Sequence, residues 1–300
     1  MNATHTADFR TFVRQVRLRG RLVPQTPLRV GAGREYSLLG DDLPVVKDAR
    51  ERPVIPGSSL KGAVRAYAEQ ILRSLAPLTD RGGDAPCLSC DPLAEPCLTN
   101  EDVERIKAEA NADVELRRQS CWACRLFGAP WMASRVLFKD LAVEEGAWFD
   151  QFGHRDGVSI DRDKGSAGDK RRYTFEVVPE NTAFAFEMVV DGTTPAELGL
   201  LLLALEGLSH GLVLLGGARS RGLGDVRLLV NWDEVEDVTP ENALSALGAR
   251  ARNEPIPAVS WTQARRDDWI GTFFQGIRLS QDAIDHWKRA RQRGEVEDAA

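Results

Sequence analysis

The sequence predicts an α+β protein built around one antiparallel sheet. Several short stretches alternate apolar and polar residues, the period of a half-buried strand, and two longer stretches repeat apolar residues at helical spacing. Without its insertions, the chain runs strand, helix, strand, strand, helix, strand. This βαββαβ order is that of the ferredoxin-like fold, in which both helices cover one face of the sheet. The opposite face and the loops remain open to a ligand, but the topology alone identifies no function.

The first strand and the first helix lie within residues 16–75. Residues 16–22 alternate apolar or small side chains with arginines, which predicts a strand with a basic open face. Residues 31–57 are rich in glycine and proline and predict a loop. Ser58 is a suitable N-cap for a helix that continues to about Leu75.

The second helix is predicted by its start signal. Thr194 and Glu197 have the spacing of a capping box around a proline, and an apolar helix should follow to about Leu208. Strands are predicted before and after it, in residues 135–143, 184–190 and 225–230.

Two insertions interrupt this core. Residues 76–134 carry all the cysteines and predict a polar helix near 101–118, and residues 153–172 are polar and predict an exposed loop or hairpin. We assign residues 1–231 to one domain. Residues 232–300 form a C-terminal extension whose role and register the sequence does not indicate.

The composition is that of a globular protein. The chain has 300 residues, of which 43% are hydrophobic and 28% charged, and its formal net charge of −6 excludes a generic polycation. Residues 1–30 nevertheless hold six arginines against one acid, so a nucleic acid could bind through local patches. We expect a cytoplasmic protein with no membrane partner, because no secretory signal follows Met1 and no apolar run is long enough to span a bilayer.

The cysteines point to a metal. All five lie between residues 87 and 124, and a reducing compartment disfavours disulfides. Cys87 with Cys90, and Cys121 with Cys124, form C-x2-C pairs of the kind that chelates zinc, and Cys97 adds a fifth thiol. Four of the five should bind one structural Zn²⁺ ion, with either Cys87 or Cys97 spare. The alternative is a set of unconnected buried cysteines.

Residues 216–224 have the composition of a phosphate-binding loop. Glycines let the backbone approach a phosphate, and Arg219 and Arg221, on either side of Ser220, supply forked donors. The alternative is an ordinary connection between a helix and a strand.

The start of the first helix could also bind an anion. Ser58, Ser59 and Lys61 lie at its N-terminus, where backbone N–H groups favour negative charge, and Arg65 follows one turn later. The same residues are equally consistent with a well-formed helix start that carries a surface lysine.

Acid–base chemistry has few candidates. Asp41 and Asp42 could hold a hard divalent ion or act as a general base, although paired aspartates in a turn usually serve the turn itself. His154 and His210 are the other candidates, and His210 is more typical of a helix C-terminal cap. Residues 155–172 hold six basic and four acidic side chains, and on these residues alone a solvated loop is favoured.

Taken together, these stretches resemble the RAMP proteins of the group-seven kind, which form the backbone of type III CRISPR effector complexes. The resemblance covers residues 15–231, and the cysteine-rich insertion is similar to that of the zinc-containing subtype III-D branch. It is carried by residues 43–48 (LPVVKD), 55–62 (IPGSSLKG), 121–128 (CWACRLFG) and 216–224 (GGARSRGLG), with the polar hairpin before Val177.

The resemblance implies an RRM-like core with a hairpin thumb at residues 153–178. Copies or paralogues would stack with other subunits along a guide RNA. The helix start at Ser58, Ser59, Lys61 and Arg65 and the loop with Arg219, Ser220 and Arg221 would contact that RNA. The thumb, with Arg155 and Arg162, would flip one base pair of the duplex between guide and complementary target RNA per subunit.

The resemblance also implies a catalytic role and a ligand set. Asp42, or its neighbour Asp41, would cleave target RNA at each interruption of the duplex with Mg²⁺ or another divalent ion. Cys90, Cys97, Cys121 and Cys124 would hold zinc, whereas spacing alone favours Cys87 over Cys97.

We therefore hypothesise a guide-RNA-binding backbone subunit that cleaves target RNA. An inactive scaffold subunit of the same complex is the first alternative. A guide-precursor-processing ribonuclease that uses His154 or His210 is the second, and a zinc-stapled protein-interaction module is the third.

Overall fold

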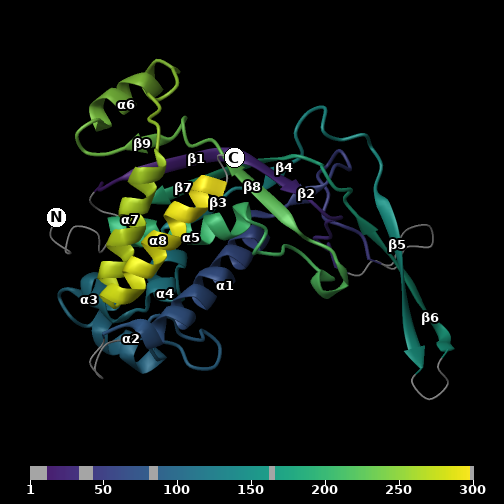
Figure 1. Ribbon diagram of the computed structural model, residues 1–300, viewed down its shortest axis with the longest axis horizontal. Coiled ribbons are helices and arrows are strands. Elements are labelled where there is room, and N and C mark those ends of the chain that lie inside the picture. Colours follow the sequence, from purple (N-terminus) through teal and green to yellow (C-terminus); the bar gives the residue numbers. More distant parts are fainter. Residues whose placement is uncertain (1–11, 34–42, 81–86, 162–165, 298–300) are drawn as a thin grey trace.

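The computed structural model describes residues 12–33, 43–80, 87–161 and 166–297, and shows the predicted α+β class with antiparallel sheets (Figure 1). An elongated body carries one long hairpin at an end of the molecule. Within the described part of the chain, no helix combines the length and the apolar character that a membrane crossing requires.

The main sheet is organised around β1. Its strands lie in the order β3-β7-β1-β8, and β9 pairs with the first residues of β1. Leu18 of β1 faces Met188 of β7, and Leu22 faces Leu228 of β8. If β1, β3, β7 and β8 are numbered one to four by their order in the sequence, they lie side by side in the order two, three, one, four. Their bounds are β1 (Gln15–Pro24), β3 (Val136–Phe138), β7 (Phe184–Asp191), β8 (Val226–Val230) and β9 (Glu236–Val238).

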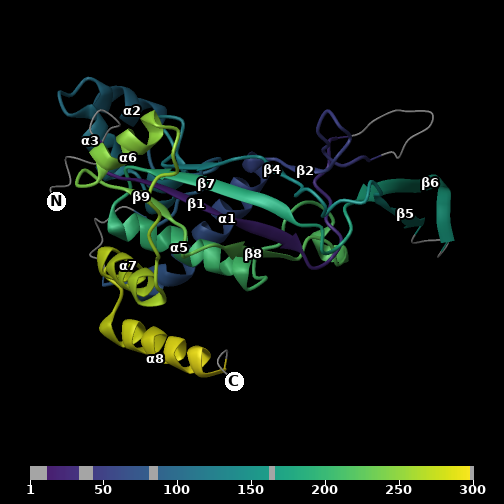
Figure 2. The same cartoon turned by 90° about the horizontal axis from the view of Figure 1, so that it is seen from above.

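Helices α1 (Gly57–Leu75) and α5 (Pro195–Ser209) lie together on one face of this sheet (Figure 2). Alternate residues of the strands and the apolar sides of both helices form the main core. The predicted capping box opens α5: the backbone N–H of Glu197 donates to Thr194 Oγ1, and the N–H of Thr194 donates to the Glu197 carboxylate.

The start of α1 differs from the sequence prediction. The N-cap is Pro56 rather than Ser58, and no side chain of the helix itself caps it. The backbone N–H of Gly57 instead donates to Asp140 Oδ1 at 2.8 Å, from the turn after β3. A Cβ at Gly57 would lie 2.2 Å from the carbonyl oxygen of Phe138, so only glycine fits this close approach.

The cysteine-bearing insertion folds into short helices with a small core of its own. The predicted polar helix is divided into α2 (Asn100–Lys107) and α3 (Ala112–Gln119), because each packs its apolar side chains against the other. A 3-10 turn, η2 (Ala76–Leu78), precedes them, and α4 (Trp122–Phe127) follows.

An ion pair joins the insertion to the main core. Arg117 of α3 donates to both carboxylate oxygens of Glu197 at 2.6 Å, and the two side chains are 7% and 2% exposed. Since Glu197 also closes the capping box, this contact couples α3 to the first turn of α5.

The second insertion forms a two-stranded hairpin that projects from the body (Figures 1 and 2). Strands β5 (Gly153–Asp161) and β6 (Ser166–Val177) pair antiparallel, with Gly153 opposite Val177 and a register shift between Val158 and Ile160. A second small sheet, formed by β2 (Val54–Ile55) and β4 (Leu141–Ala142), precedes it along the chain.

The C-terminal extension continues the core. It supplies β9 to the main sheet and packs α7 (Gln263–Gly276) against α5, where a Cβ at Gly199 would lie 2.1 Å from the carbonyl oxygen of Trp269. Trp261 is fully buried and donates to Asp237, which also pairs with Arg14 at 2.6 Å. The remaining helices are α6 (Ala243–Ala251) and α8 (Gln281–Glu297).

Replacing Arg117 should destabilise the fold strongly. Arg117→Ala leaves the Glu197 carboxylate buried without its ion-pair partner, and we expect the free energy of unfolding to fall by about 3–5 kcal/mol. Arg118→Ala is the matched control, because Arg118 is the next residue of α3 and pairs with Glu115 at the surface. Chemical denaturation of both variants measures the difference. Equal midpoints for the two variants would contradict a structural role for the buried pair.

Candidate nucleic-acid interface and cysteine cluster

The loop at residues 216–224 has a backbone that requires glycine. Gly216, Gly222 and Gly224 have φ values of 81°, 80° and 85°. A Cβ at Gly216 would lie 2.2 Å from the carbonyl oxygen of Arg29, and the N–H of Gly217 donates to the same oxygen at 2.8 Å. The loop is therefore held against the segment that follows β1.

Between these glycines, the loop presents its polar residues to solvent. Arg219, Ser220 and Arg221 form a single 3-10 turn, η3 (Arg219–Arg221), and all three are exposed. Arg221 Nη1 donates to Tyr173 Oη at 2.5 Å, which links the loop to the base of the hairpin.

A pocket of about 300 Å³ lies where the loop meets the hairpin. It combines two arginines, two aromatic rings and small or apolar side chains from four separate stretches of the chain: Arg29, Leu43, Tyr173, Phe175, Ala218, Ser220 and Arg221. The guanidinium carbon of Arg29 lies 5.6 Å from the ring centroid of Phe175. Of the two aromatic residues, Phe175 is buried and Tyr173 half-buried.

Sequence reasoning did not assign Arg29, Tyr173 or Phe175 to a site. Their interactions join residues that lie far apart in the sequence, such as Arg221 with Tyr173 and Arg29 with Phe175, which no local pattern reveals. The available signal was the pair of aromatic residues at alternate positions in an otherwise polar hairpin strand.

Ion pairing separates the arginines of this protein into two groups. The arginines of the predicted basic strand face form ion pairs across the open face of the sheet. Arg17 and Arg19 both pair with Glu187 and Glu236, and Arg21 pairs with Glu144 at 2.9 Å. Charge on this face is therefore largely neutralised within the protein.

The arginines around the pocket are different. Neither Arg29, Arg219 nor Arg221 forms an ion pair with any carboxylate that the structure describes. Positive charge left without an internal partner favours an anionic ligand. Among the described residues, this loop is a stronger candidate for phosphate contact than the arginine-rich strand.

The predicted anion-binding residues at the start of α1 do not all face solvent. Ser58 is exposed, and Ser59 and Lys61 are half-buried. Burial, with a smaller effect of the positive charge of Arg65, lowers the pKa of Lys61. Arg65 turns away toward the insertion: it donates to Glu69 at 2.8 Å and to the carbonyl oxygen of Gly128 at 2.9 Å.

The predicted catalytic pair, Asp41 and Asp42, lies outside the described residues, as does Arg162. The chain is described again from Leu43, whose carbonyl oxygen accepts the N–H of Glu176 in β6. The Glu176 carboxylate accepts the N–H of Val45 at 3.2 Å and Lys47 Nζ at 3.0 Å. The segment directly after Asp42 is thus fixed to the base of the hairpin beside the pocket.

The remaining predicted residues lie at the hairpin and at the end of α5. Arg155 and His154 are exposed on β5. His210 is the C-cap of α5, and its Nδ1 lies 2.7 Å from the carbonyl oxygen of Glu206, as expected of a helix cap.

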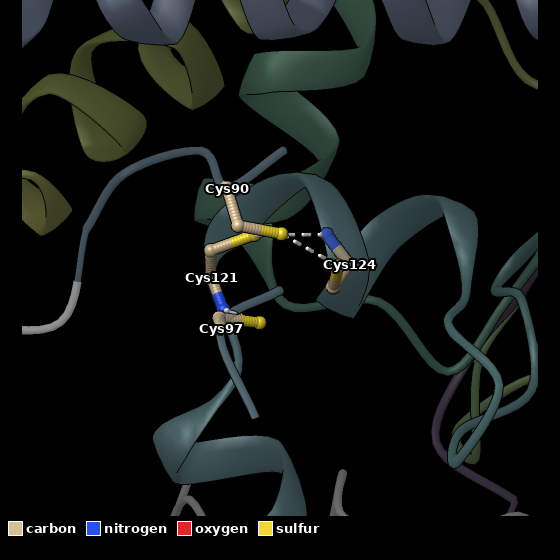
Figure 3. Close-up of side chains that lie close together, drawn as sticks. All are labelled: Cys90, Cys97, Cys121 and Cys124. Atoms are coloured by element: carbon tan, nitrogen blue, oxygen red, sulfur yellow. Dashed lines mark hydrogen bonds between the residues drawn. The ribbon is translucent and has the colours of Figure 1, made fainter. Parts of the chain in front are cut away.

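Four cysteines come together around the start of α4 (Figure 3). The Sγ atoms of Cys90, Cys97, Cys121 and Cys124 all lie within 4.8 Å of one another, whereas Cys87 is exposed and outside the group. The set agrees with the ligands that the family resemblance implies and differs from the spacing argument, which favours Cys87.

Local structure explains how the cluster forms. Cys121 is the N-cap of α4, and its Sγ accepts the N–H of Cys124 at 3.5 Å, so one helix start positions both residues. The N–H of Cys121 in turn donates to Cys97 Sγ at 3.5 Å. These contacts bring Cys97, rather than Cys87, to the C-x2-C pair at the start of α4.

The cluster has the chemistry of a metal site. Hydrogen bonds with Cys124 and Cys97 hold the pKa of Cys121 far below its usual range, whereas the hydrogen bonds to Cys121 raise the pKa of Cys97 to about 12 and also raise that of Cys124. Arg65 Nη2 lies 3.8 Å from Cys124 Sγ and brings a positive charge to the thiols. Four sulfur ligands in a largely buried group suit a metal ion such as zinc.

Comparison with known proteins places these features in a family. A family model for the RAMP superfamily matches residues 21–227. The protein named "CRISPR system Cms endoribonuclease Csm3" of Mycobacterium tuberculosis is 27% identical over 236 residues, which cover 71% of this chain and 86% of that protein. The protein of the same name from Enterococcus italicus is 36% identical over 74 residues, 24% of this chain and 35% of that protein. Because the family model spans more than half of the chain, this protein belongs to the RAMP superfamily.

Proposed function

We propose that this chain is a guide-RNA-binding backbone subunit of a type III CRISPR ribonucleoprotein and that it cleaves complementary target RNA. The relatives named as Csm3 endoribonucleases support the assignment to such a complex. The observation that carries RNA binding is the exposed loop with Arg219 and Arg221, which have no carboxylate partner in the described part of the chain.

The geometry favours contact with the RNA backbone rather than with base edges. Guanidinium groups on an exposed turn are typical phosphate ligands, and such contacts carry no sequence information. A backbone subunit must accept any guide sequence, so this mode of binding suits the proposed role. The strand order two, three, one, four, with both helices on one face, supports an RRM-like, ferredoxin-like core.

We propose Asp42, with Asp41 as the alternative, as the residue that takes the proton from the 2′-OH of a target nucleotide. The 2′-oxygen then attacks the adjacent phosphorus, the bond from phosphorus to the 5′-oxygen breaks, and a proton from water neutralises that leaving oxygen. The products are a 2′,3′-cyclic phosphate and a 5′-hydroxyl end. The fixed position of Leu43 beside the pocket supports this placement. The need for Mg²⁺ or another divalent ion stays a prediction.

We also propose that Cys90, Cys97, Cys121 and Cys124 bind one structural Zn²⁺ ion. These four residues would hold the ion with sulfur ligands alone, which would leave no position for a substrate. Bound zinc would join residues 90–97 to the start of α4 and, through Arg65, would hold the insertion against α1.

Arg219→Ala and Arg221→Ala should weaken guide RNA binding equally for unrelated sequences. Each variant leaves one RNA phosphate without its arginine, so the slope of log affinity against log salt should flatten by roughly one unit in each variant. Salt titrations with two guides of different sequence measure this. Arg105→Ala is the control, since Arg105 is an exposed arginine of α2 that pairs with Asp102. Weakening confined to one guide sequence would refute binding through the RNA backbone.

Asp42→Ala should abolish cleavage by the assembled complex. We expect the regularly spaced cuts in a labelled complementary RNA to disappear while guide binding is retained, because the side chain acts on the target. Asp41→Ala is tested beside it, and both are compared with the wild type in Mg²⁺ and in chelator. Cutting that persists unchanged in both variants would make this chain a scaffold and assign cleavage to its partners.

Cys124→Ser should reduce bound zinc from one equivalent to well below one and lower the thermal stability. Cys87→Ser should leave both quantities unchanged, because Cys87 lies outside the group. Elemental analysis of the purified chains and thermal unfolding give the two readouts. The assignment would be wrong if Cys87→Ser released as much metal as Cys124→Ser.

A further inference from the structure

We infer that the groove between α7 and α8 binds a helix of another protein subunit. An acidic side chain of that helix would lie at Lys288, a basic one at Asp268 and an apolar one over Gly271. The inference rests on the proposed function, because the helix would belong to a subunit of the same complex. The groove itself lies outside residues 21–227, which the family model matches.

The groove has a volume of about 500 Å³, which is within the range of ligand pockets. Side chains of α8 bridge to the neighbouring helices. Trp287 packs edge-on against Phe274 of α7 with ring centroids 5.1 Å apart, and Arg291 pairs with Asp267 of α7 and with Glu206 of α5. Both walls of the groove are therefore held in place by interactions with core elements.

Gly271 leaves open space in the groove. A glycine inside a helix is unfavourable relative to alanine, and a close contact often requires it. Gly276 of α7 has such a contact, since a Cβ there would lie 2.9 Å from the ring of Trp122. A Cβ at Gly271, by contrast, would meet no described atom within 4 Å. Together with the half-buried ring of Trp287, this space would accommodate an apolar side chain of a partner.

Each wall of the groove keeps one charge without an internal partner. Arg291 and Asp267 neutralise each other, but Asp268 on α7 and Lys288 on α8 are exposed, and neither forms an ion pair with any residue that the structure describes. RNA is disfavoured here, because the carboxylates of α7 would repel its phosphates. A helix with acidic side chains on one flank and basic side chains on the other complements both walls, and a helix laid in a groove is a recurring mode of protein recognition.

The place of the groove leaves the proposed RNA surface free. Helices α7 and α8 lie at the end of the molecule away from the hairpin, and α8 is the outermost layer, beyond α7 (Figures 1 and 2). The glycine-rich loop is linked to the base of the hairpin through Arg221. One chain could therefore hold guide RNA and this protein partner at the same time.

Site-specific photocrosslinking in the assembled complex tests the inference. The full chain carries p-benzoylphenylalanine in place of Thr272, which lines the groove, or of Glu254, an exposed residue between α6 and α7. Each complex is isolated through a tag on this chain, irradiated and analysed by mass spectrometry. The position of Thr272 should crosslink to a peptide of a second protein that has acidic and basic residues at helical spacing. The position of Glu254 should not crosslink to that peptide.

Substitutions in the groove separate its occupancy from the stability of the chain. Gly271→Trp fills the open space, so at least about tenfold less of the second protein should copurify, with guide RNA retained. Gly271→Ala should keep the second protein and raise the thermal midpoint of the chain by a few degrees, because alanine favours a helix. Lys288→Glu should also release the second protein and keeps the test valid if Gly271→Trp does not fold. Lys107→Glu, at an exposed lysine of α2, is its control and should release none.

The outcomes distinguish the inference from the proposed function. A wild-type complex without guide RNA would overturn both, because the partner is assigned to that complex. With guide RNA present, the inference alone would fail if the position of Thr272 crosslinked to no protein, to RNA or only to a second copy of this chain. It would also fail if Gly271→Trp and Lys288→Glu both retained the second protein at the level of the wild type.

Discussion

The arrangement of this protein depends on the pairing of β1 with strands on both of its sides. β1 pairs along most of its length with β7, and its other edge is shared between β9 at the start and β8 at the end. Beyond the strand, the N–H of Leu28 donates to the carbonyl oxygen of Val178, and the N–H of Val178 donates back at 2.7 Å. Gly31 then pairs with Val45. One continuous segment therefore positions the hairpin, the glycine-rich loop and the chain after Asp42.

Local signals in the sequence predict local structure well. The alternating strands and the capping box of Thr194 and Glu197 depend on neighbouring residues, and the structure contains both. Ser58 fails as the N-cap of α1 because Asp140, far away in the sequence, supplies the partner instead. Spacing likewise favours Cys87, whereas the start of α4 brings in Cys97. Wherever a distant residue completes a feature, a local pattern cannot reveal it.

The same limit explains the C-terminal extension and the pocket. The burial of Trp261 and Asp237 depends on the pairing of β9 with β1 and on Arg14, which contacts both residues. No pattern within residues 232–300 indicates these contacts. The pocket requires the end of β1, the hairpin and the glycine-rich loop to meet. Sequence reasoning found the loop through its glycines and arginines, but it had no means to add Arg29 or Tyr173.

An acidic chain can bind RNA only if its positive charge is distributed unevenly. The acids of the sheet pair with the arginines of β1, so a region of the sequence that is rich in basic residues becomes an ion-paired structural surface. The arginines near the pocket have no such partners in the described part of the chain, although they are fewer. Local pairing, rather than net charge or the count of arginines, therefore decides where a polyanion can bind.

Helix α1 links the cysteine cluster to the proposed RNA surface. Arg65 contacts Cys124 Sγ and the carbonyl oxygen of Gly128, and Lys61 lies one turn earlier on the same helix. Burial and, to a smaller extent, the like charge of Arg65 lower the pKa of Lys61, and the contacts of Arg65 with the insertion fix its position on the helix. A phosphate bound at Lys61 would offset the like charge of Arg65. The insertion thus fixes one side of the helix whose first turn carries the predicted RNA-binding residues.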